Sequence, residues 1–450
     1  MRRLRTAARV ACADARAEGA LRSAARARAR SLRRGDLALA EPSLIDYQAT
    51  LDCVHCGLCL PHCPTYQETG RESSSPRGRI YLMRGVAEER IPLDELVVDE
   101  MSLCLGCRAC ESACPAGVRY GHLLEGMRAE IDVRGARGRV RRFAARIALR
   151  RVVASKGVLR ALVGALRVYQ RSGMQRVLRA SRLLGLVPPL ARMERILPTL
   201  PDSHRAPLLI PARGARRGRV AFFSGCLMPE VFGPVNAATI EVLARNGFEV
   251  EVPTGQGCCG ALHLHAGDPE AAERLHAANV AAFRLDGIDA LILNSAGCGA
   301  ALRESGDGLA RKVRDVTEFL AEVGLRETPR PLAMRVAYDD PCHLLHGQRV
   351  AAAPRDLLRA IPELDLFDLP GCRDCCGAAG IYNLTQPAMS ARLLERKIQA
   401  IRDTAPEAVV SGNPGCLLQI GAGVRASRLP VEVLHPIELL ARAYADSRQS

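Results

Sequence analysis

Short apolar runs alternate with longer amphipathic stretches through the second half of the chain. Runs of strand type occupy residues 219–225, 248–252, 289–294, 335–338, 364–367 and 408–411. Stretches of helical periodicity lie between them, for example at residues 236–246 and 269–285. The second of these opens with Asp268 and Pro269, an N-cap residue followed by proline at the first helical position. This alternation predicts parallel sheets whose strands are joined by right-handed helical crossovers.

A pattern of four cysteines occurs twice in this half of the chain. The first copy contains Cys226, Cys258, Cys259 and Cys298, and the second contains Cys342, Cys375, Cys376 and Cys416. Corresponding cysteines are 116 to 118 residues apart, and one constant period indicates an internal repeat. We therefore predict two Rossmann-like parallel α/β domains, at residues 219–330 and 331–450. Because ligands gather at the carboxyl ends of parallel strands, the four cysteines of each copy should converge on one site at the edge of its sheet.

Helical periodicity dominates the first half of the chain. Residues 80–89 and 93–103 predict helices within a domain at residues 46–130. Residues 131–218 form a basic connector in which apolar residues recur at helical spacing among arginines, until six prolines interrupt the pattern. Residues 1–45 are a basic N-terminal extension. The longest uncharged stretch, residues 408–424, contains Asn, Pro and Gly, so we predict strand and turn there and no membrane-spanning helix.

Charge is distributed unevenly along the chain. The net charge is +15, to which residues 1–34 contribute +9 and residues 134–219 contribute +20, so the rest of the protein is acidic. A localised basic segment usually faces phospholipid, an acidic partner or nucleic acid. The arginine-rich connector could lie on an anionic membrane surface or pack on its own protein, and the sequence leaves both open. We expect no nucleic-acid partner, because Trp is absent, Tyr and Phe are few and the basic stretch lacks a recognition motif.

Eight further cysteines form two matching runs. The spacing C-x2-C-x2-C-x3-C-P occurs at Cys53, Cys56, Cys59 and Cys63, and again at Cys104, Cys107, Cys110 and Cys114. Such runs hold two [4Fe–4S] clusters in bacterial-type ferredoxins, where the fourth cysteine of each run reaches the other cluster. We therefore assign Cys53, Cys56, Cys59 and Cys114 to one cluster, and Cys104, Cys107, Cys110 and Cys63 to the other. The 40 residues between the runs are largely helix-forming, which predicts an α-helical ferredoxin domain.

Structural zinc and disulfide bonds are the competing interpretations of these cysteines. Zinc needs one tetrahedral set of four ligands and gives no reason for two triplets that are each followed by Cys-Pro. Disulfides form mainly in exported proteins, and we find no export signal. Eighteen cysteines, mostly clustered at ligand spacing, favour iron–sulfur binding in a reducing compartment.

Charged and titratable residues accompany both sets of cysteines. Arg77, Arg79 and Arg84 follow the first run. They lie either at a solvated helix start or close enough to a cluster to raise its potential or to dock a partner. Four histidines lie beside the repeated cysteines, at His263, His265, His343 and His346. Imidazole can ligate iron or move a proton, although a histidine beside a turn more often forms an ordinary hydrogen bond.

The paired Cys-Cys-Gly repeat resembles the cysteine-rich (CCG) domain of heterodisulfide reductase and of flavin-linked dehydrogenase subunits. With the ferredoxin domain and the segments at residues 76–82 and 114–120, residues 46–445 are similar to the iron–sulfur subunit of bacterial glycolate oxidase (glycolate dehydrogenase). The resemblance implies a complex whose FAD-containing partner subunits oxidise glycolate to glyoxylate. It implies that this chain passes the electrons to a membrane acceptor, with quinone expected, from a cytoplasmic position on the inner face of the plasma membrane.

One departure from that family's pattern affects the metal prediction. The fuller repeat ends in C-x-x-C and has five cysteines for an unusual cluster, whereas Ser295 and Asn413 occupy the first of those positions here. Four cysteines remain in each copy, enough for one or two further iron–sulfur clusters in all, and Cys372 could add a ligand in the second copy. The alternative is that these cysteines are buried thiols without metal. The departure also argues against heterodisulfide chemistry.

The sequence contains no site for substrate chemistry of its own. It has no G-x-G-x-x-G after a strand, no phosphate loop and no Ser/His/Asp pattern, so we assign no catalytic residue. A hydroxy acid gives up two electrons as hydride, which a partner flavin would accept and release singly to iron–sulfur clusters. These features predict an electron-transfer subunit, and the family resemblance implies that its oxidoreductase acts on glycolate. The alternatives are the equivalent subunit for lactate or glycerol 3-phosphate, and a heterodisulfide-reductase-like protein.

Overall fold

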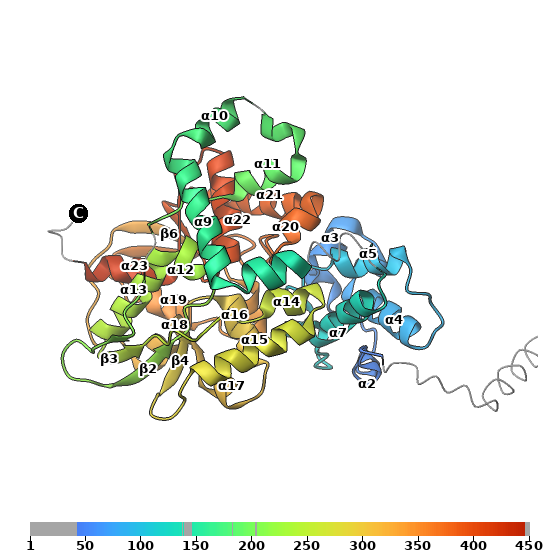
Figure 1. Cartoon of the computed structure of the whole chain (residues 1–450), viewed down its shortest axis with the longest axis horizontal. Coiled ribbons are helices and arrows are strands. Elements are labelled where there is room, and N and C mark those ends of the chain that lie inside the picture. Colours follow the sequence, from blue (N-terminus) through green and yellow to red (C-terminus); the bar gives the residue numbers. More distant parts are fainter. Residues whose placement is uncertain (1–42, 137, 139–145, 182, 203–204, 446–450) are drawn as a thin grey trace, which may run out of the picture. The chain divides into compact units, whose positions relative to one another are not determined.

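The computed structural model describes residues 43–136, 138, 146–181, 183–202 and 205–445 (Figure 1). The chain divides into two compact units, Met1–Leu44 and Ile45–Ser450. Only Ser43 and Leu44 of the first unit are described, so the predictions for the rest of the N-terminal extension lie outside the described residues. All the described helices and strands belong to the second unit.

Within the described residues, the predicted ferredoxin domain consists of helices joined by loops. Its helices are α2 (Tyr47–Leu51), η1 (Leu60–His62), α3 (Pro64–Thr69), η2 (Glu72–Ser74), α4 (Pro76–Ala87), α5 (Glu95–Leu103), α6 (Ala109–Ser112) and α7 (Tyr120–Val133). Side-chain caps fix the start of the two predicted helices. Ser75 accepts a hydrogen bond from the Gly78 N–H at the start of α4, and Asp94 accepts one from the Val97 N–H at the start of α5. Apolar side chains of α4, α5 and α7 fill one core.

The described part of the connector is mainly helical, with strand β1 (Leu209–Ile210) near its end. Its helices are η3 (Ala148–Val153), α9 (Lys156–Arg171), α10 (Met174–Ala180), η4 (Leu183–Leu186) and α11 (Pro188–Ile196). Its arginines pair with acids elsewhere in the protein: Arg150 lies 2.6 Å from Asp268, and Arg167 lies 3.6 Å from Glu230. These pairs favour packing on the protein for much of the basic segment. Across the described ranges, every helix is too short or too polar to traverse a bilayer.

Each repeat contains a parallel sheet with the same strand order. In the first, β2 (Gly218–Phe222), β3 (Phe248–Glu251), β4 (Ala290–Leu293) and β5 (Val313–Asp315) are ordered β3-β2-β4-β5, and β1 (Leu209–Ile210) pairs antiparallel with β3. In the second, β6 (Met334–Tyr338), β7 (Leu364–Asp368), β8 (Ala408–Val410) and β9 (Glu432–Leu434) are ordered β7-β6-β8-β9. The predicted fold class, an α-helical ferredoxin domain followed by two repeated parallel α/β domains, is confirmed.

Helices connect the strands of both sheets. The first repeat has α12 (Met228–Val231), α13 (Gly233–Arg245), α14 (Ala261–Ala266), α15 (Pro269–Ala282), α16 (Ala296–Arg303), α17 (Gly308–Lys312) and α18 (Val316–Val323). The second has η5 (His343–Gly347), α19 (Ala353–Arg359), α20 (Tyr382–Thr385), α21 (Pro387–Thr404), α22 (Pro414–Ala426) and α23 (Pro436–Tyr444). The predicted cap at Asp268 is confirmed, since its side chain accepts from the Ala271 N–H at the start of α15.

The two repeats share one hydrophobic core. Helices α13 and α19 each follow the first strand of the parallel sheet in their repeat, and α18 and α23 each follow the last. Helix α13 packs against α23, and α18 packs against α19, so equivalent helices exchange partners as they would across a twofold axis. Phe222 of β2, Tyr338 of β6 and Leu440 of α23 meet in this core and have no exposed surface. Burial across the boundary makes each repeat depend on the other for stability.

Two features of the repeats differ from prediction. Residues 408–424 hold β8 and most of α22, so the prediction of strand and turn is wrong from residue 414 onward. Proline at the first position and a largely buried surface outweigh the low helix propensity of three glycines in α22. The edge strands β1, β5 and β9 are absent from the prediction, because runs of two or three residues show no periodicity.

Truncating the shared core should destabilise the whole pair of repeats. Leu440→Ala removes a buried side chain and leaves a cavity, so the free energy of unfolding should fall by about 2–5 kcal/mol. Val280 of α15, which is 39% exposed, provides a control, and Val280→Ala should change that free energy by about 0.5 kcal/mol. Chemical denaturation followed by circular dichroism measures both, and equal unfolding midpoints would show that the repeats do not depend on this core.

Candidate metal centres

Four of the eight ferredoxin-type cysteines line one cavity, which we call the enclosed site. Cys63, the last cysteine of the first run, joins Cys104, Cys107 and Cys110 of the second around about 300 Å³ of space, part of it open to solvent. This grouping results from η1, which ends just before Cys63 and packs against α6 of the second run. The sequence predicts the same four cysteines for the second cluster. Their roles as ligands remain a prediction.

A buried guanidinium group lies at the enclosed site. Arg79 of α4 has no exposed surface and lines the cavity. Its Nε donates to the Glu100 carbonyl oxygen (2.7 Å), and one terminal nitrogen donates to the Thr65 hydroxyl (3.1 Å) and lies 3.9 Å from the Glu100 carboxylate. The other terminal nitrogen has no hydrogen-bond partner among the described residues. A buried cation needs compensating negative charge, so the cavity fits a thiolate-bound iron–sulfur cluster. The solvated-helix interpretation is wrong for Arg79.

Two arginines favour the thiolate form of Cys104. Burial alone would raise the pKa of this thiol, but the guanidinium groups of Arg79 and Arg128 outweigh burial and hold its pKa below the ordinary value. The Tyr120 hydroxyl and the Gly106 N–H also donate to Cys104 Sγ, at 3.6 and 3.4 Å. Metal ligands must be deprotonated, and hydrogen bonds to ligating sulfur help to set a cluster's potential. The surroundings of Cys104 therefore favour the thiolate form that a metal ligand requires.

Arg128 on α7 is a functional candidate that sequence analysis missed. It is buried, and it donates to the carbonyl oxygens of Met101 (3.2 Å) and Cys104 (2.7 Å). The sequence did contain an indication of its burial. The residues one and four positions before Arg128 and three positions after it are all apolar. A charged residue on a buried helical face implies an anion nearby.

The two cysteine runs share one backbone shape. In each run, the residues on either side of the second cysteine have a left-handed backbone conformation. They are His55 and Gly57 in the first run (φ 55° and 87°), and Gly106 and Arg108 in the second (φ 66° and 65°). Residues of this kind occur in loops whose N–H groups form anion-binding concavities. Glycine suits position 57, because its backbone is left-handed and a Cβ there would displace the Arg77 guanidinium group, which would lie 2.7 Å away. Arg77 in turn donates to the His55 carbonyl oxygen (2.9 Å), so it supports the first loop.

We give the name surface site to the other four ferredoxin-type cysteines, whose grouping around one cluster stays a prediction. Cys56 is exposed, whereas Cys53, Cys59 and Cys114 are partly buried and pack against the core of the helical domain. Burial raises the pKa of Cys59. The exposed side of this group is accessible to a partner protein.

The four cysteines of the first repeat come together at the carboxyl ends of three strands. Cys226 follows β2, Cys258 and Cys259 follow β3, and Cys298 lies in the first turn of α16 after β4. The sulfur atoms of Cys259 and Cys298 are 3.1 Å apart. Hydrogen bonds from Cys226 and Cys259 lower the pKa of Cys258 and raise those of the two donors. The expected convergence at the sheet edge is therefore observed in the first repeat.

The cysteines of the second repeat converge in the same way. Cys342 interacts with Cys375, which interacts with Cys376, and the sulfur atoms of Cys376 and Cys416 are 3.4 Å apart. Burial and the neighbouring thiols raise the pKa of Cys376 and Cys416. Both repeats therefore present a compact set of four thiols.

The second repeat also adjoins the enclosed site. Leu105 and Cys107 of the helical domain pack in one cluster with Cys375 and Tyr382. The Tyr382 hydroxyl donates to the Leu103 carbonyl oxygen (2.8 Å), which joins α20 to the end of α5. Apolar contact therefore links a predicted ligand of the enclosed site to the cysteines of the second repeat.

Ser295 and Asn413, which replace a cysteine of the fuller motif, lie where the repeats meet. The Gly297 N–H donates to Asn413 Oδ1 (3.2 Å), and the Ala296 N–H donates to the Gly412 carbonyl oxygen (3.2 Å). The loops after β4 and β8 are thereby joined. Asn413 serves the contact between repeats at a position where the fuller motif has a ligand.

Cys372 lies beside a charged cluster. Its sulfur is 4.0 Å from the Arg355 guanidinium group, which pairs with Asp340. Burial, together with the carboxylates of Asp340 and Asp368, raises the pKa of Cys372 to about 11. These contacts give the thiol other partners and weaken the prediction that it adds a metal ligand.

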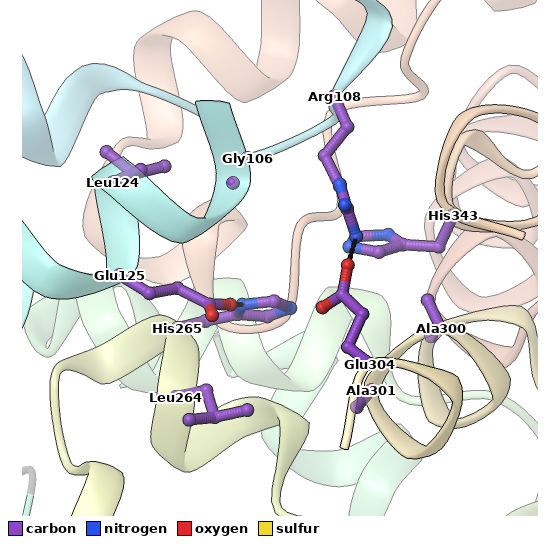
Figure 2. Close-up of a pocket in the computed structure, with 12 residues that line it drawn as sticks. Gly106, Arg108, Leu124, Glu125, Leu264, His265, Ala300, Ala301, Glu304 and His343 are labelled. Carbon is purple, nitrogen blue, oxygen red and sulfur yellow. Dashed lines mark hydrogen bonds and ion pairs between the residues drawn. The ribbon is translucent and has the colours of Figure 1, made fainter. Parts of the chain in front are cut away.

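A pocket of about 400 Å³, part of it open to solvent, lies where the helical domain meets both repeats (Figure 2). Figure 2 shows His265 of the first repeat against Glu125, and Arg108 reaching towards Glu304. His265 Nδ1 lies 3.2 Å from Glu125 Oε1, and the rings of His265 and His343 are 5.4 Å apart. Burial lowers the pKa of His343 to about 3, which keeps this imidazole neutral. The pocket therefore joins the three domains through ion pairs and a neutral histidine.

The described cysteines are all free. These seventeen thiols form no disulfide. Within the described ranges, no group of three or more His, Cys, Asp or Glu side chains is placed to hold a single metal ion. A cubane cluster offers a different iron to each of its four sulfur ligands, so its ligands need not converge on one point as those of zinc must.

Three family models match the chain. The model described as "Cysteine-rich domain" matches residues 220–303 and 336–421. The model "Glycolate oxidase iron-sulfur subunit, linker region" matches residues 140–197. The model "4Fe-4S dicluster domain" matches residues 49–118. Together they cover the ferredoxin domain, most of the connector and both repeats.

Curated relatives extend this similarity over most of the chain. A Bacillus subtilis protein named "Probable glycolate oxidase iron-sulfur subunit" is 39% identical over 426 residues, which cover 89% of this chain and 95% of the relative. The "Glycolate oxidase iron-sulfur subunit" of Escherichia coli is 34% identical, covering 87% of this chain and 93% of the relative. "Lactate utilization protein A" of Oceanobacillus iheyensis is 31% identical, covering 49% of this chain and 96% of the relative. The family resemblance seen in the sequence is confirmed.

Removing the charge of Arg79 should make the enclosed site harder to reduce. Arg79→Met keeps the length of the side chain but removes a buried cation, and the reduction potential should fall by the equivalent of about 1.5–3 kcal/mol. Arg71→Met is the matched control, because Arg71 also lies near Glu100 but its side chain is 61% exposed. Redox titration of the anaerobic protein, followed by paramagnetic resonance, measures both variants. Equal shifts would contradict a specific effect of Arg79.

Proposed function

The chain belongs to the family of glycolate oxidase iron–sulfur subunits, and from this premise we propose that it carries electrons within a glycolate oxidase complex. FAD-containing partner subunits would oxidise glycolate to glyoxylate, and this chain would pass the electrons to a membrane quinone. The observation that carries the proposal is the succession of three cysteine groups, from the surface site through the enclosed site to the second repeat.

The positions of these groups support electron entry at the surface site. Bound iron–sulfur clusters would supply one-electron transfer, which matches a flavin that releases two electrons singly. Cys56 leaves the surface site open to a partner flavoprotein, and Cys63 joins the first cysteine run to the enclosed site. Cys107 then packs in the same cluster as Cys375. The three cysteine groups therefore lie within one folded unit.

The surrounding residues suit a relay rather than a substrate site. Arg79 and Arg128 place positive charge next to the enclosed site, where it would stabilise the reduced, more negative state. Leu105, Tyr382 and Met389 keep water from the contact between the enclosed site and the second repeat. A dry, rigid environment lowers the reorganisation that accompanies each transfer.

A lactate-oxidising complex is the second candidate. It is favoured by relatives named for lactate utilisation, but these cover about half of this chain. The glycolate oxidase linker at residues 140–197 and the relatives that match over most of the chain favour glycolate. Activity like that of heterodisulfide reductase is less consistent with Asn413, which serves the contact between repeats.

The connector supplies a surface for membrane attachment. Eight apolar side chains of its helices and loops are 49–79% exposed: Val168, Met174, Val177, Leu183, Leu186, Val187, Leu190 and Met193. Arg176 and Arg195 are exposed among them. Apolar side chains with interspersed arginines bind anionic membrane surfaces. We infer that the subunit lies peripherally on the inner face of the plasma membrane, with α10 and α11 (Figure 1) against the lipid.

Loss of one predicted ligand should stop the relay without affecting the flavin. In the complex purified without oxygen, Cys110→Ser should reduce the iron content by about four atoms per chain. It should lower quinone reduction by glycolate at least about a hundredfold, because the path is broken. Glycolate oxidation with a dye that accepts electrons from the flavin should continue. Cys372→Ser is the control and should retain quinone reduction. Loss of flavin in Cys110→Ser, or unchanged quinone reduction, would contradict the relay.

Charge placed on the apolar surface of the connector should release the protein from lipid. The double variant Val177→Glu, Leu186→Glu should bind vesicles containing anionic phospholipid at least about tenfold more weakly, because two apolar contacts are lost and like charge is introduced. Leu96→Glu on α5, where the side chain is 76% exposed, is the control and should bind as the parent does. Sedimentation with vesicles measures all three proteins. A parent protein that stays in the supernatant would refute membrane attachment through this surface.

A further inference from the structure

The two repeats differ at one position beside their cysteines. His263 lies on α14, three residues after Gly260 of the first Cys-Cys-Gly sequence. The corresponding residue of the second repeat is Gly380, three residues after Gly377. The first repeat therefore places a side chain that can bind metal where the second has none.

The His263 imidazole is completely buried, and its ring nitrogens lack well-formed hydrogen bonds. It has no exposed surface, and neither of its ring nitrogens has a hydrogen-bond partner of good geometry among the described residues. Buried polar groups are nearly always satisfied, and an exception calls for an explanation such as an ion. An apolar side chain would fill this position at lower cost, so the imidazole needs a reason to be there.

The imidazole lies against the thiols of the first repeat. The His263 N–H donates to the Gly260 carbonyl oxygen (2.9 Å), which places the histidine on the first turn after Cys258 and Cys259. The imidazole also interacts with the Cys258 thiol and, after the larger effects of Cys226 and Cys259, lowers its pKa. Cys259 is in turn 3.1 Å from Cys298. Four sulfurs and one nitrogen thus form a set of five potential metal ligands, the number that the fuller repeat supplies with five cysteines; a cubane cluster would take four of them.

The backbone holds His263 in this position. Gly260 is left-handed (φ 87°), and a Cβ there would lie 3.2 Å from Ala272, so only glycine allows the tight turn into α14. The His263 carbonyl oxygen accepts from the Asp268 N–H (2.9 Å). The Asp268 carboxylate pairs with Arg150 through two contacts of 2.6 Å. A side chain fixed from both ends of its helix has the rigidity that metal ligands need.

His265, on the same short helix, has a different environment. Figure 2 shows it in the pocket between the helical domain and the repeats, lying against Glu125, with 3.2 Å between His265 Nδ1 and Glu125 Oε1. Its hydrogen bond and partial exposure explain it without a metal. His265 is therefore a matched control for His263.

We propose that His263 is a nitrogen ligand of an iron–sulfur cluster in the first repeat, and that the two repeats therefore hold chemically different sites. The inference rests on the proposed function, because it needs the first repeat to hold a cluster. A neutral imidazole adds less negative charge than a thiolate, and histidine ligation raises the potential of iron–sulfur clusters. The cluster of the first repeat should be reduced at a higher potential than the same cluster with cysteine at position 263.

The test uses the full chain, purified without oxygen after growth with ¹⁴N- or ¹⁵N-labelled histidine. Pulsed paramagnetic resonance of the reduced protein should show one nitrogen coupled directly to a cluster, with a splitting that changes with the isotope. Cys259→Ser should remove this coupled signal and leave the signals of the ferredoxin domain. His263→Cys should retain iron, abolish the coupling and lower the reduction potential of that cluster. His265→Ala should keep the coupling.

The outcomes distinguish failure of the His263 inference from failure of the proposed electron relay. A cluster in the first repeat without nitrogen coupling, or a coupling that survives His263→Cys, overturns the inference and leaves the relay intact. If iron is limited to about eight atoms per chain, all in the ferredoxin domain, the repeats hold no cluster and the inference is wrong. Zinc in the first repeat would also overturn the inference. If His263→Cys does not fold, the isotope measurement on the parent protein decides alone.

Discussion

Positive charge buried among thiols is the constraint on which the helical domain depends. Arg79 and Arg128 are enclosed within the domain, and both favour the thiolate of Cys104. Buried guanidinium groups without anions would be strongly unfavourable, and so would buried thiolates without cations. The fold satisfies both groups because Arg79 and Tyr120 line the same cavity as Cys104, and Arg128 donates to the Cys104 carbonyl oxygen. The structure of the domain and its fitness for an anionic cluster therefore have the same physical cause.

The twofold arrangement of the repeats extends this relation to the rest of the chain. A shared core makes the two sheets one body, and the loops that contain Ser295 and Asn413 meet at the boundary. The second repeat then packs its cysteines against Cys107 of the helical domain. In the first repeat, Cys226 instead packs in a cluster with Leu159 of the connector. The repeats are alike in fold but differ in what surrounds their thiols, and His263 is the clearest difference.

Spacing and periodicity were sufficient to predict the repeat, its inner strands and the grouping of Cys63 with the second cysteine run, because these depend on local patterns. What the sequence left open depends on packing. Whether Arg79 is solvated or buried is decided by α5 and α7, which cover it. The connector arginines suggested an anionic partner, yet Arg150 pairs with Asp268, 118 residues away. Helix α22 was missed because its glycines obscure a helix that is stabilised by burial.

Iron and acid-labile sulfide content of the full chain, purified without oxygen, test the central claim most directly. The account predicts a coloured protein with at least about eight irons and eight sulfides per chain, the number that two cubane clusters require. A colourless preparation without iron, or one in which zinc occupies the ferredoxin cysteines, would contradict it.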